Sequence, residues 1–187
     1  MNNQLNSNNG FSTAAAFINN SSQAVFLTGK AGTGKTTFLK YIKENTPKNC
    51  AIVAPTGVAA INAGGTTIHS FFQLPFSPFL PFGNSARGNE NAIDKHSLFS
   101  KIRLSNERKD VMQQLELLII DEISMVRADV LDAIDTILRQ VRSRYNSPFG
   151  GVQVLYIGDM YQLPPVVKDE EWLLLRDLYD NPFFFSS

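Results

Sequence analysis

Residues 24–36, Ala-Val-Phe-Leu-Thr-Gly-Lys-Ala-Gly-Thr-Gly-Lys-Thr, are the stretch that decides the fold. The apolar run 24–28 predicts a buried β-strand, and residues 29–36 fit the pattern G-x-x-x-x-G-K-[ST] of a phosphate-binding loop. In such a loop, glycines let the backbone turn tightly so that successive N–H groups point at phosphate oxygens. The helix expected over residues 35–45 adds the partial positive charge of its N-terminus. Together these features predict a P-loop nucleotide site.

The side chains of this loop have separate expected roles. Lys35 would reach the β- and γ-phosphates of a nucleotide, and the Thr36 hydroxyl would ligate Mg²⁺. A glycine-rich turn without a ligand is the alternative, and the strand and helix on either side argue against it. The residues expected to contact the nucleotide are Gly29, Ala31, Gly32, Thr33, Gly34, Lys35, Thr36 and Thr37.

An acidic pair supplies the second half of such a site. The apolar run 117–120 predicts another buried strand, which brings Asp121 and Glu122 to the carboxyl edge of a sheet, where ligands bind in α/β proteins. There Asp121 can hold the Mg²⁺ hydration shell, and Glu122 can polarise a water for in-line attack on the γ-phosphate. The pair could instead only cap the next element, but the upstream P-loop favours nucleotide hydrolysis.

The identity of the base rests on weaker signals. No N-K-x-D motif, which reads guanine, occurs in the chain, so ATP is favoured over GTP. Gln4 and Asn6 are weak candidates for contacts with the base. The expected cofactors are ATP and Mg²⁺, with no other metal, because His69 and His96 have no companion ligands at useful spacing.

The remaining apolar segments predict an α/β fold. Residues 50–54 and 154–157 are two further strands that are apolar along their whole length, and helices separate all four strands. Such strands indicate a central, mainly parallel sheet flanked by helices on both faces. The clearest helix runs over residues 130–141, where apolar residues recur every three or four positions and Asp135 and Arg139 are spaced for an ion pair.

One terminus and one insertion complete the expected organisation. Residues 1–12 are Asn-rich and uncharged and are expected to be a flexible terminus, followed by the ATPase domain over residues 13–187. A small insertion is expected at about 73–114. Within it, prolines are each followed by Phe in segment 75–82, which could be a strand-splitting wedge, a partner site, or a loop whose rings cover the core. The last interpretation is preferred.

Composition and charge exclude several classes of protein. With 43% hydrophobic and 18% charged residues among 187, and no apolar run above five residues, the chain is ordinary for a globular protein and predicts no membrane span. The single Cys50 excludes a disulfide framework, and the first charge, Lys30, lies too late for a basic leader. We therefore expect a cytoplasmic protein, in a bacterial-type cytosol, or a nuclear or mitochondrial one if eukaryotic. Net charge is zero, but residues 1–120 carry +5 and residues 121–187 carry −5, which permits a basic face for a polyanion without requiring one.

Four further motifs resemble, in order and spacing, those of superfamily 1 helicases. The run Pro-Phe-Gly-Gly at residues 148–151 narrows the resemblance to the petite-integration-frequency (PIF) family of ATP-dependent DNA helicases, which move 5′ to 3′ on single strands. The resemblance spans about residues 24–167 and implies a RecA-like motor domain. The four motifs are APTGVAA at 54–60, TIHSFF at 67–72, DEISM at 121–125 and GDMYQLPPV at 158–166.

The resemblance assigns roles to residues outside the P-loop. Gln162 would join Lys35 and Glu122 in catalysis by bonding the γ-phosphate and reporting its loss, although a Gln before Leu-Pro-Pro is more often ordinary loop. N–H groups at a helix start could hold a DNA phosphate, and rings in the next motif could stack on bases, with one of Phe71 and Phe72 expected in the core. The expected DNA contacts are Pro55, Thr56, Gly57, His69 and Phe72.

The resemblance also implies partners. Helicases of this type have a second RecA-like domain that supplies an arginine finger, and Arg87, Arg103 and Arg108 match no finger motif, so the chain is expected to be a fragment. Expected partners are single-stranded DNA, duplex junctions and the chain's own missing C-terminal motor domain, with the chain a monomer that serves DNA repair and telomere maintenance. Two alternatives stay open: a nucleotide-gated single-strand-binding module without turnover, and an AAA+-like P-loop ATPase, against which the motifs at 67–71 and 158–166 argue.

Overall fold

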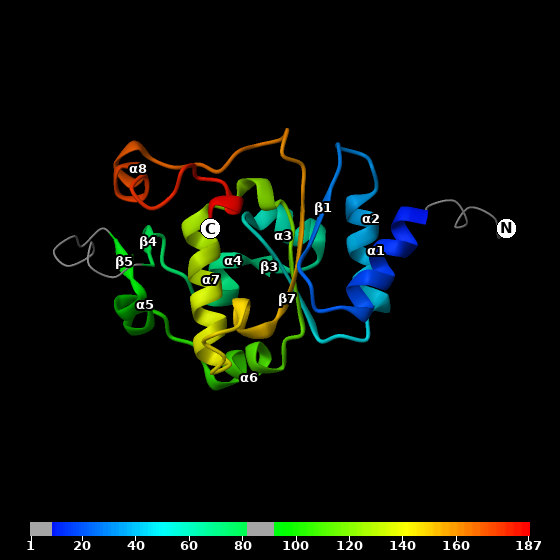
Figure 1. The fold of residues 1–187 in the computed structure, drawn as a ribbon, viewed down its shortest axis with the longest axis horizontal. Coiled ribbons are helices and arrows are strands. Elements are labelled where there is room, and N and C mark those ends of the chain that lie inside the picture. The colour runs from blue at the N-terminus through cyan, green and yellow to red at the C-terminus, as the bar shows by residue number, and fades with distance from the viewer. Residues whose placement is uncertain (1–8, 82–91) are drawn as a thin grey trace.

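The computed structural model describes residues 9–81 and 92–187. Figure 1 shows a central sheet with α1 and α2 on one side and α6 and α7 on the other. The helices are α1 (Asn9–Asn20), α2 (Lys35–Asn45), α3 (Gly57–Ala63), α4 (Ile68–Phe72), α5 (Lys95–Lys101), α6 (Asn106–Gln114), α7 (Ala128–Val141) and α8 (Asp169–Leu175), with 3₁₀ turns η1 (Ile123–Met125), η2 (Pro148–Gly151) and η3 (Phe184–Ser186). The strands are β1 (Val25–Thr28), β2 (Cys50–Ala54), β3 (Thr66–Thr67), β4 (Phe79–Leu80), β5 (Ile93–Asp94), β6 (Leu117–Ile120) and β7 (Gln153–Gly158). None of the helices in the described ranges has both the length and the apolar character needed to cross a membrane.

The five-stranded sheet has the order β1-β7-β6-β2-β3, and every neighbouring pair is parallel. This confirms the expected parallel sheet and the expected strands at 50–54 and 117–120. β7 extends one residue beyond the expected 154–157 at each end. β1 was expected to be buried and to start at Ala24; it starts at Val25 and alternates between half-buried and exposed residues, because in the described structure it is an edge strand that pairs with β7 alone.

Successive side chains of β6 face opposite layers of the core. Leu118 and Ile120 join the apolar cluster that includes α6 and α7, whereas Leu117 and Ile119 join the cluster that includes α1 and α2. All four side chains are fully buried. A one-residue slip would draw the charged Glu116 or Asp121 into the core, so the burial of all four residues fixes the register of β6 and therefore the point at which Asp121 emerges.

Helix α1 begins at Asn9, so the expected flexible terminus 1–12 is too long: its last four residues are helical. The physical reason is aromatic packing. The ring of Phe11 lies edge-on to Phe38, with ring centroids 4.8 Å apart, and 5.2 Å from the ring of Tyr41. These contacts tie the first turn of α1 to α2.

The insertion expected at about 73–114 contains a separate two-stranded parallel sheet, β4 with β5, and the helices α5 and α6. Several of its apolar side chains, such as Phe79 and Met112, belong to the main core cluster, whereas Leu80 and Ala92 belong to a separate cluster with Leu175 of α8. The segment therefore continues the core layer in part. Phe79 is buried, as the preferred interpretation of the Pro-Phe segment requires, whereas Phe76 is 85% exposed and does not cover the core. Phe82 lies outside the described residues.

Helix α7 extends the expected 130–141 helix by two residues at its start. The expected ion pair between Asp135 and Arg139 is present, with 2.6 Å between its charged atoms. The same carboxylate of Asp135 accepts the backbone N–H of Phe149, which fixes the Pro-Phe-Gly-Gly turn η2. In this structure the motif that narrowed the resemblance therefore connects α7 to the start of β7.

Candidate active site

The P-loop joins β1 to α2 with the backbone geometry that its glycines predict. Gly32 and Gly34 have φ values of 77° and 92°, in the left-handed region that glycine adopts without a Cβ clash. The turn closes on itself, because the N–H and the hydroxyl of Thr33 donate to the carbonyl of Lys30 at 3.3 and 2.8 Å. Gly34 is the N-cap of α2 and brings no capping side chain, so the first N–H groups of the helix keep their donor capacity for an anion.

Lys35 is half-buried and folds back over this loop. Its ammonium donates to the carbonyls of Gly29 and Lys30, at 2.5 and 3.1 Å. Burial raises the pKa of both Asp121 and Glu122, and the nearby charge of Lys35 opposes that rise. The P-loop lysine and the acidic pair therefore lie in one electrostatic environment.

The acidic pair continues directly from β6. The backbone N–H of Asp121 donates to the carbonyl of Val53 at 2.9 Å, which carries the ladder between β6 and β2 up to the site. Burial raises the pKa of Glu122, and the adjacent charge of Asp121 raises it further, so Glu122 is a better proton acceptor near neutral pH than an ordinary glutamate. Glu122 also has φ 52° and ψ 44°, a left-handed conformation that is uncommon for any residue except glycine. Its surroundings hold it there against this backbone strain.

The two residues expected to hold Mg²⁺ suit that ion. The Thr36 hydroxyl and the Asp121 carboxylate are hard oxygen donors, which Mg²⁺ prefers. Within residues 9–81 and 92–187, no group of three or more His, Cys, Asp or Glu side chains could form an all-protein metal cage. One hydroxyl and one carboxylate fit an ion that arrives with nucleotide phosphates and keeps several of its waters.

Asp159 is a site residue that sequence reasoning missed. It follows β7 directly, and its side chain is only 5% exposed. The hydrogen bond from the backbone N–H of Tyr161 lowers the pKa of Asp159, and the amide of Gln162 and the charge of Lys35 act in the same direction. The expected sensor, Gln162, is exposed and lies beside it, with its amide nitrogen 3.1 Å from the carboxylate. A signal was available, because Asp159, like Asp121, is the first charged residue after a buried parallel strand.

The run expected to bind a DNA phosphate lies at the start of α3. Pro55 is half-buried and Gly57 is exposed. The Thr56 hydroxyl accepts the backbone N–H of Ala59 at 3.2 Å and so caps the helix. A hydroxyl has one donor in addition to its acceptor sites, so Thr56 can cap α3 and still donate to a phosphate oxygen.

The prediction that Phe72 contacts DNA is wrong, because its side chain is fully buried in the main core. Ile68 and Phe72 are four residues apart and therefore share the face of α4 that packs on the core, which leaves Phe71 only partly buried. His69 lies on another face and stacks on the exposed ring of Phe76, with centroids 4.6 Å apart and an interplanar angle of 14°. Sequence reasoning did not single out Phe76 as the exposed ring.

The two described arginines of the insertion, Arg108 and Arg103, do not lie at the nucleotide site. Arg108 donates to the carbonyls of Ser70 and Phe71, at 2.6 and 3.1 Å, and so ties α6 to the end of α4. Arg103 is exposed in the loop before α6. The remaining candidates, Arg87, Gln4 and Asn6, lie outside the described residues.

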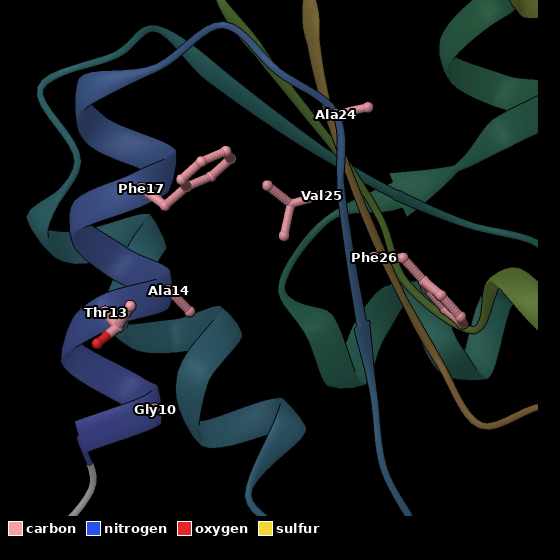
Figure 2. A pocket seen from close by; sticks show the side chains of 7 residues that line it. All are labelled: Gly10, Thr13, Ala14, Phe17, Ala24, Val25 and Phe26. Carbon is pink, nitrogen blue, oxygen red and sulfur yellow. The ribbon is translucent and has the colours of Figure 1, made fainter.

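A hollow with a volume of 610 Å³ lies between α1 and β1. Figure 2 shows Phe17 and Val25 facing one another across it, with Phe26 on the opposite side of β1. None of the residues that line it is charged, so a phosphate would find no counter-charge there. The P-loop remains the site suited to an anion.

Comparison with known proteins gives the family. Residues 5–173 match the PIF1-like helicase family. The chain is 38% identical over 150 residues to the ATP-dependent DNA helicase PIF1 of Saccharomyces cerevisiae (strain YJM789), covering 78% of this chain and 16% of that protein. It is 39% identical over 153 residues to the ATP-dependent DNA helicase PIF1 of Homo sapiens, covering 80% of this chain and 21% of that protein. The chain thus spans about a fifth of the length of the curated relatives it matches.

Solved structures agree with this assignment. The Pif1 helicase from Bacteroides in complex with ADP-AlF3 and ssDNA has a TM-score of 0.83 and 46% identity, over 96% of this chain and 38% of that chain. The Pif1 helicase from Candida albicans has a TM-score of 0.71 and 34% identity, over 96% of this chain and 36% of that chain. These likenesses confirm the RecA-like fold and the resemblance drawn from the motifs. The chain belongs to the PIF1-like helicase family.

Proposed function

We propose that this chain is the ATP-binding and ATP-hydrolysing motor domain of a DNA helicase that acts on single-stranded DNA and moves 5′ to 3′. The observation that carries the proposal is the convergence of Lys35, Asp121 and Glu122 at the carboxyl edge of one parallel sheet, beside a P-loop. The names of the relatives support it, since those 38% and 39% identical are ATP-dependent DNA helicases. The crystal structure of the Bacteroides neighbour contains ADP-AlF3 and ssDNA, which supports both ligands.

In this proposal each residue of the edge has one task. Lys35 exchanges its bonds to loop carbonyls for bonds to β- and γ-phosphate oxygens. Glu122 accepts a proton from the attacking water, and Gln162 reaches the γ-phosphate from the turn after β7. Thr36 and Asp121 hold Mg²⁺, which when bound stabilises negative charge on the phosphate oxygens.

The DNA contacts proposed for this domain are of two kinds. The Thr56 hydroxyl and the start of α3 bind a phosphate, and this contact weakens as salt rises. The His69–Phe76 pair offers rings to a base, and Phe76 takes the role that the sequence assigned to Phe72. Burial lowers the pKa of His69 below its ordinary 6.5, and Arg127 adds to this effect, so His69 is neutral at neutral pH and contributes a ring without a charge. Single strands and the single-stranded side of duplex junctions fit these contacts.

The competing function is a module that binds single-stranded DNA and does not hydrolyse ATP. Nucleotide binding alone would control its affinity for DNA. The position of Arg108, bonded to backbone carbonyls of α4, favours slow turnover because that arginine is committed to a structural contact. Phosphate release from ATP, measured with and without a single-stranded oligonucleotide, separates the two functions. Lys35→Ala and Glu122→Gln control for contaminating ATPases.

For a motor domain we expect the chain alone to hydrolyse ATP very slowly, because the resemblance places the arginine finger in a second RecA-like domain. Joined to that domain, the chain should show hydrolysis that single-stranded DNA stimulates and that both substitutions abolish. DNA affinity that changes with nucleotide, together with phosphate release no greater than in Lys35→Ala even when the second domain is present, would establish the binding module in its place.

A further inference from the structure

Asp159 closes a short turn directly after β7. The backbone N–H of Gln162 donates to the Asp159 carbonyl at 3.0 Å. One carboxylate oxygen of Asp159 accepts the backbone N–H of Tyr161 at 3.1 Å, and the other accepts the side-chain amide of Gln162, also at 3.1 Å. The backbone and the carboxamide of Gln162 are therefore both fixed to one residue.

The chemistry of this contact determines which way the carboxamide faces. The hydrogen bond from Tyr161 holds the pKa of Asp159 low, so the group is an ionised carboxylate that only accepts hydrogen bonds. The NH₂ group of Gln162 must then face Asp159, with its carbonyl oxygen turned away. One N–H of that group is used by the carboxylate, and the second can bond another acceptor at the same time. A γ-phosphate oxygen is such an acceptor.

The turn also touches the loop that carries the acidic pair. A Cβ on Gly158 would lie 2.9 Å from a side-chain carbon of Ile123 and 3.3 Å from the backbone N of Ser124, so β7 and η1 are in direct contact only because residue 158 is glycine. The positive charge of Lys35 helps to lower the pKa of Asp159, so the P-loop and the turn after β7 also interact electrostatically. The turn after β7 therefore lies against the segment that follows Glu122 and within the electrostatic reach of the P-loop lysine.

We propose that Asp159 is a positioning residue that orients the Gln162 amide toward the γ-phosphate and so lets the chain distinguish a nucleoside triphosphate from a diphosphate. This inference rests on the proposed function, in which nucleotide binds at the P-loop. Asp159 acts through Gln162 and does not itself contact the nucleotide. Without the carboxylate, an exposed Gln side chain samples many rotamers and loses entropy when it bonds the phosphate.

Calorimetric titration of the chain with ADP and with a non-hydrolysable ATP analogue, each with Mg²⁺, tests the proposal. Asp159→Asn keeps the volume of the side chain and an oxygen for the Tyr161 N–H, but it puts an NH₂ group where the Gln162 amide needs an acceptor. Tyr161→Ala is the matched control, because it alters the same turn at a side chain that is 95% exposed and leaves the backbone N–H in place. Gln162→Ala and the double variant with Asp159→Asn complete a cycle.

The wild-type chain should prefer the triphosphate analogue, and Gln162→Ala should reduce that preference about tenfold, as expected for loss of a hydrogen bond to a charged group. Asp159→Asn should cause the same reduction without weakening ADP, and the double variant should be no worse than either single one. Tyr161→Ala should keep the preference. If the role of Asp159 were purely structural, Asp159→Asn would lower the affinity for both nucleotides together.

Failure of the positioning role can be distinguished from failure of the proposed function. If Asp159→Asn keeps the preference, or if the wild type has none, the positioning role is wrong even though the P-loop assignment stands. If Lys35→Ala binds both nucleotides as the wild type does, the proposed function itself fails.

Discussion

The carboxyl edge of the sheet and the aromatic segment 69–79 present their side chains in different ways. At the edge, the main chain places the functional groups: Lys35 begins a helix, and Asp121 directly follows a strand that is buried on both faces. In the aromatic segment, packing decides which ring is available, since Phe72 is inside and Phe76 is outside. A conservative substitution at the carboxyl edge leaves the backbone, and therefore the position of the new side chain, unchanged. Such substitutions should therefore alter nucleotide binding or hydrolysis. Substitutions in the aromatic segment should alter stability or binding according to burial.

The largest effect should come from Glu122→Gln at the edge. Because the amide cannot accept the proton of the attacking water, turnover of ATP in the intact enzyme, with its second motor domain, should fall about 10²–10⁴-fold while affinity for Mg-ATP is kept. Phosphate release and calorimetry measure the two quantities. Glu116→Gln makes the same chemical change just before the other end of β6, where the side chain accepts the backbone N–H of Asn49 and a Gln carbonyl can do so too. An equal loss of turnover in this control would show that Glu122 has no special role.

Two substitutions in the aromatic segment should have separate effects, one on stability and the other on DNA binding. Phe72→Ala removes a fully buried ring and should lower the free energy of unfolding by about 3–5 kcal/mol in urea titrations. Phe76→Ala should change that free energy by less than about 0.5 kcal/mol. It should instead weaken binding of a fluorescent single strand by about 1–3 kcal/mol. Unchanged DNA affinity with Phe76→Ala would mean that the His69–Phe76 stack is not part of the DNA groove.

A smaller effect should appear in the free energy of unfolding when Asp121, at the carboxyl edge, is changed. Burial raises the pKa of Asp121, so the folded chain binds this proton more tightly than the unfolded chain does. The free energy of unfolding therefore falls as pH rises from the ordinary value of 3.8 through the raised value in the fold, and the whole penalty is present at neutral pH. Asp121→Asn should consequently stabilise the chain at neutral pH, and less so near the ordinary pKa. If Asp121→Asn destabilises the chain more than the exposed control Asp110→Asn does, the carboxylate is satisfied in the fold and this reasoning is wrong.

The smallest effect should come from Ser124→Ala, two residues after Glu122. Among the described residues, Ser124 carries a buried side-chain oxygen for which the structure has no hydrogen-bond partner. Removing an unsatisfied hydroxyl should be neutral or stabilising by up to about 1 kcal/mol. Ser97→Ala is the contrast, since that hydroxyl accepts the Asp94 N–H in the capping box of α5, and its loss should cost about 1 kcal/mol. Thermal unfolding measures both, and a clear loss of stability with Ser124→Ala would mean that its hydroxyl is bonded.

Sequence patterns predicted most of the sheet and the edge because both follow from local rules. Buried strands at 50–54 and 117–120 are apolar throughout, and the groups that follow a parallel strand meet at its carboxyl edge. The exposure of β1 could not be predicted in this way, because its edge position depends on strand order. Nor could the choice between Phe71 and Phe72, because the core partners of α4 lie far away in the sequence. The position of Asp159 directly after a buried parallel strand was visible in the sequence, but its role depends on hydrogen bonds within its turn, which the sequence does not show.

Nucleotide binding by the P-loop is the central claim, and calorimetry of Mg-ATP binding to Lys35→Ala tests it most directly. Lys35 supplies a charge that backbone N–H groups cannot replace, so its loss should weaken binding by about 1–3 kcal/mol. Lys40→Ala removes an exposed lysine from the same helix, α2, and should bind Mg-ATP as the wild type does. Equal affinity in the wild type and Lys35→Ala would contradict the account.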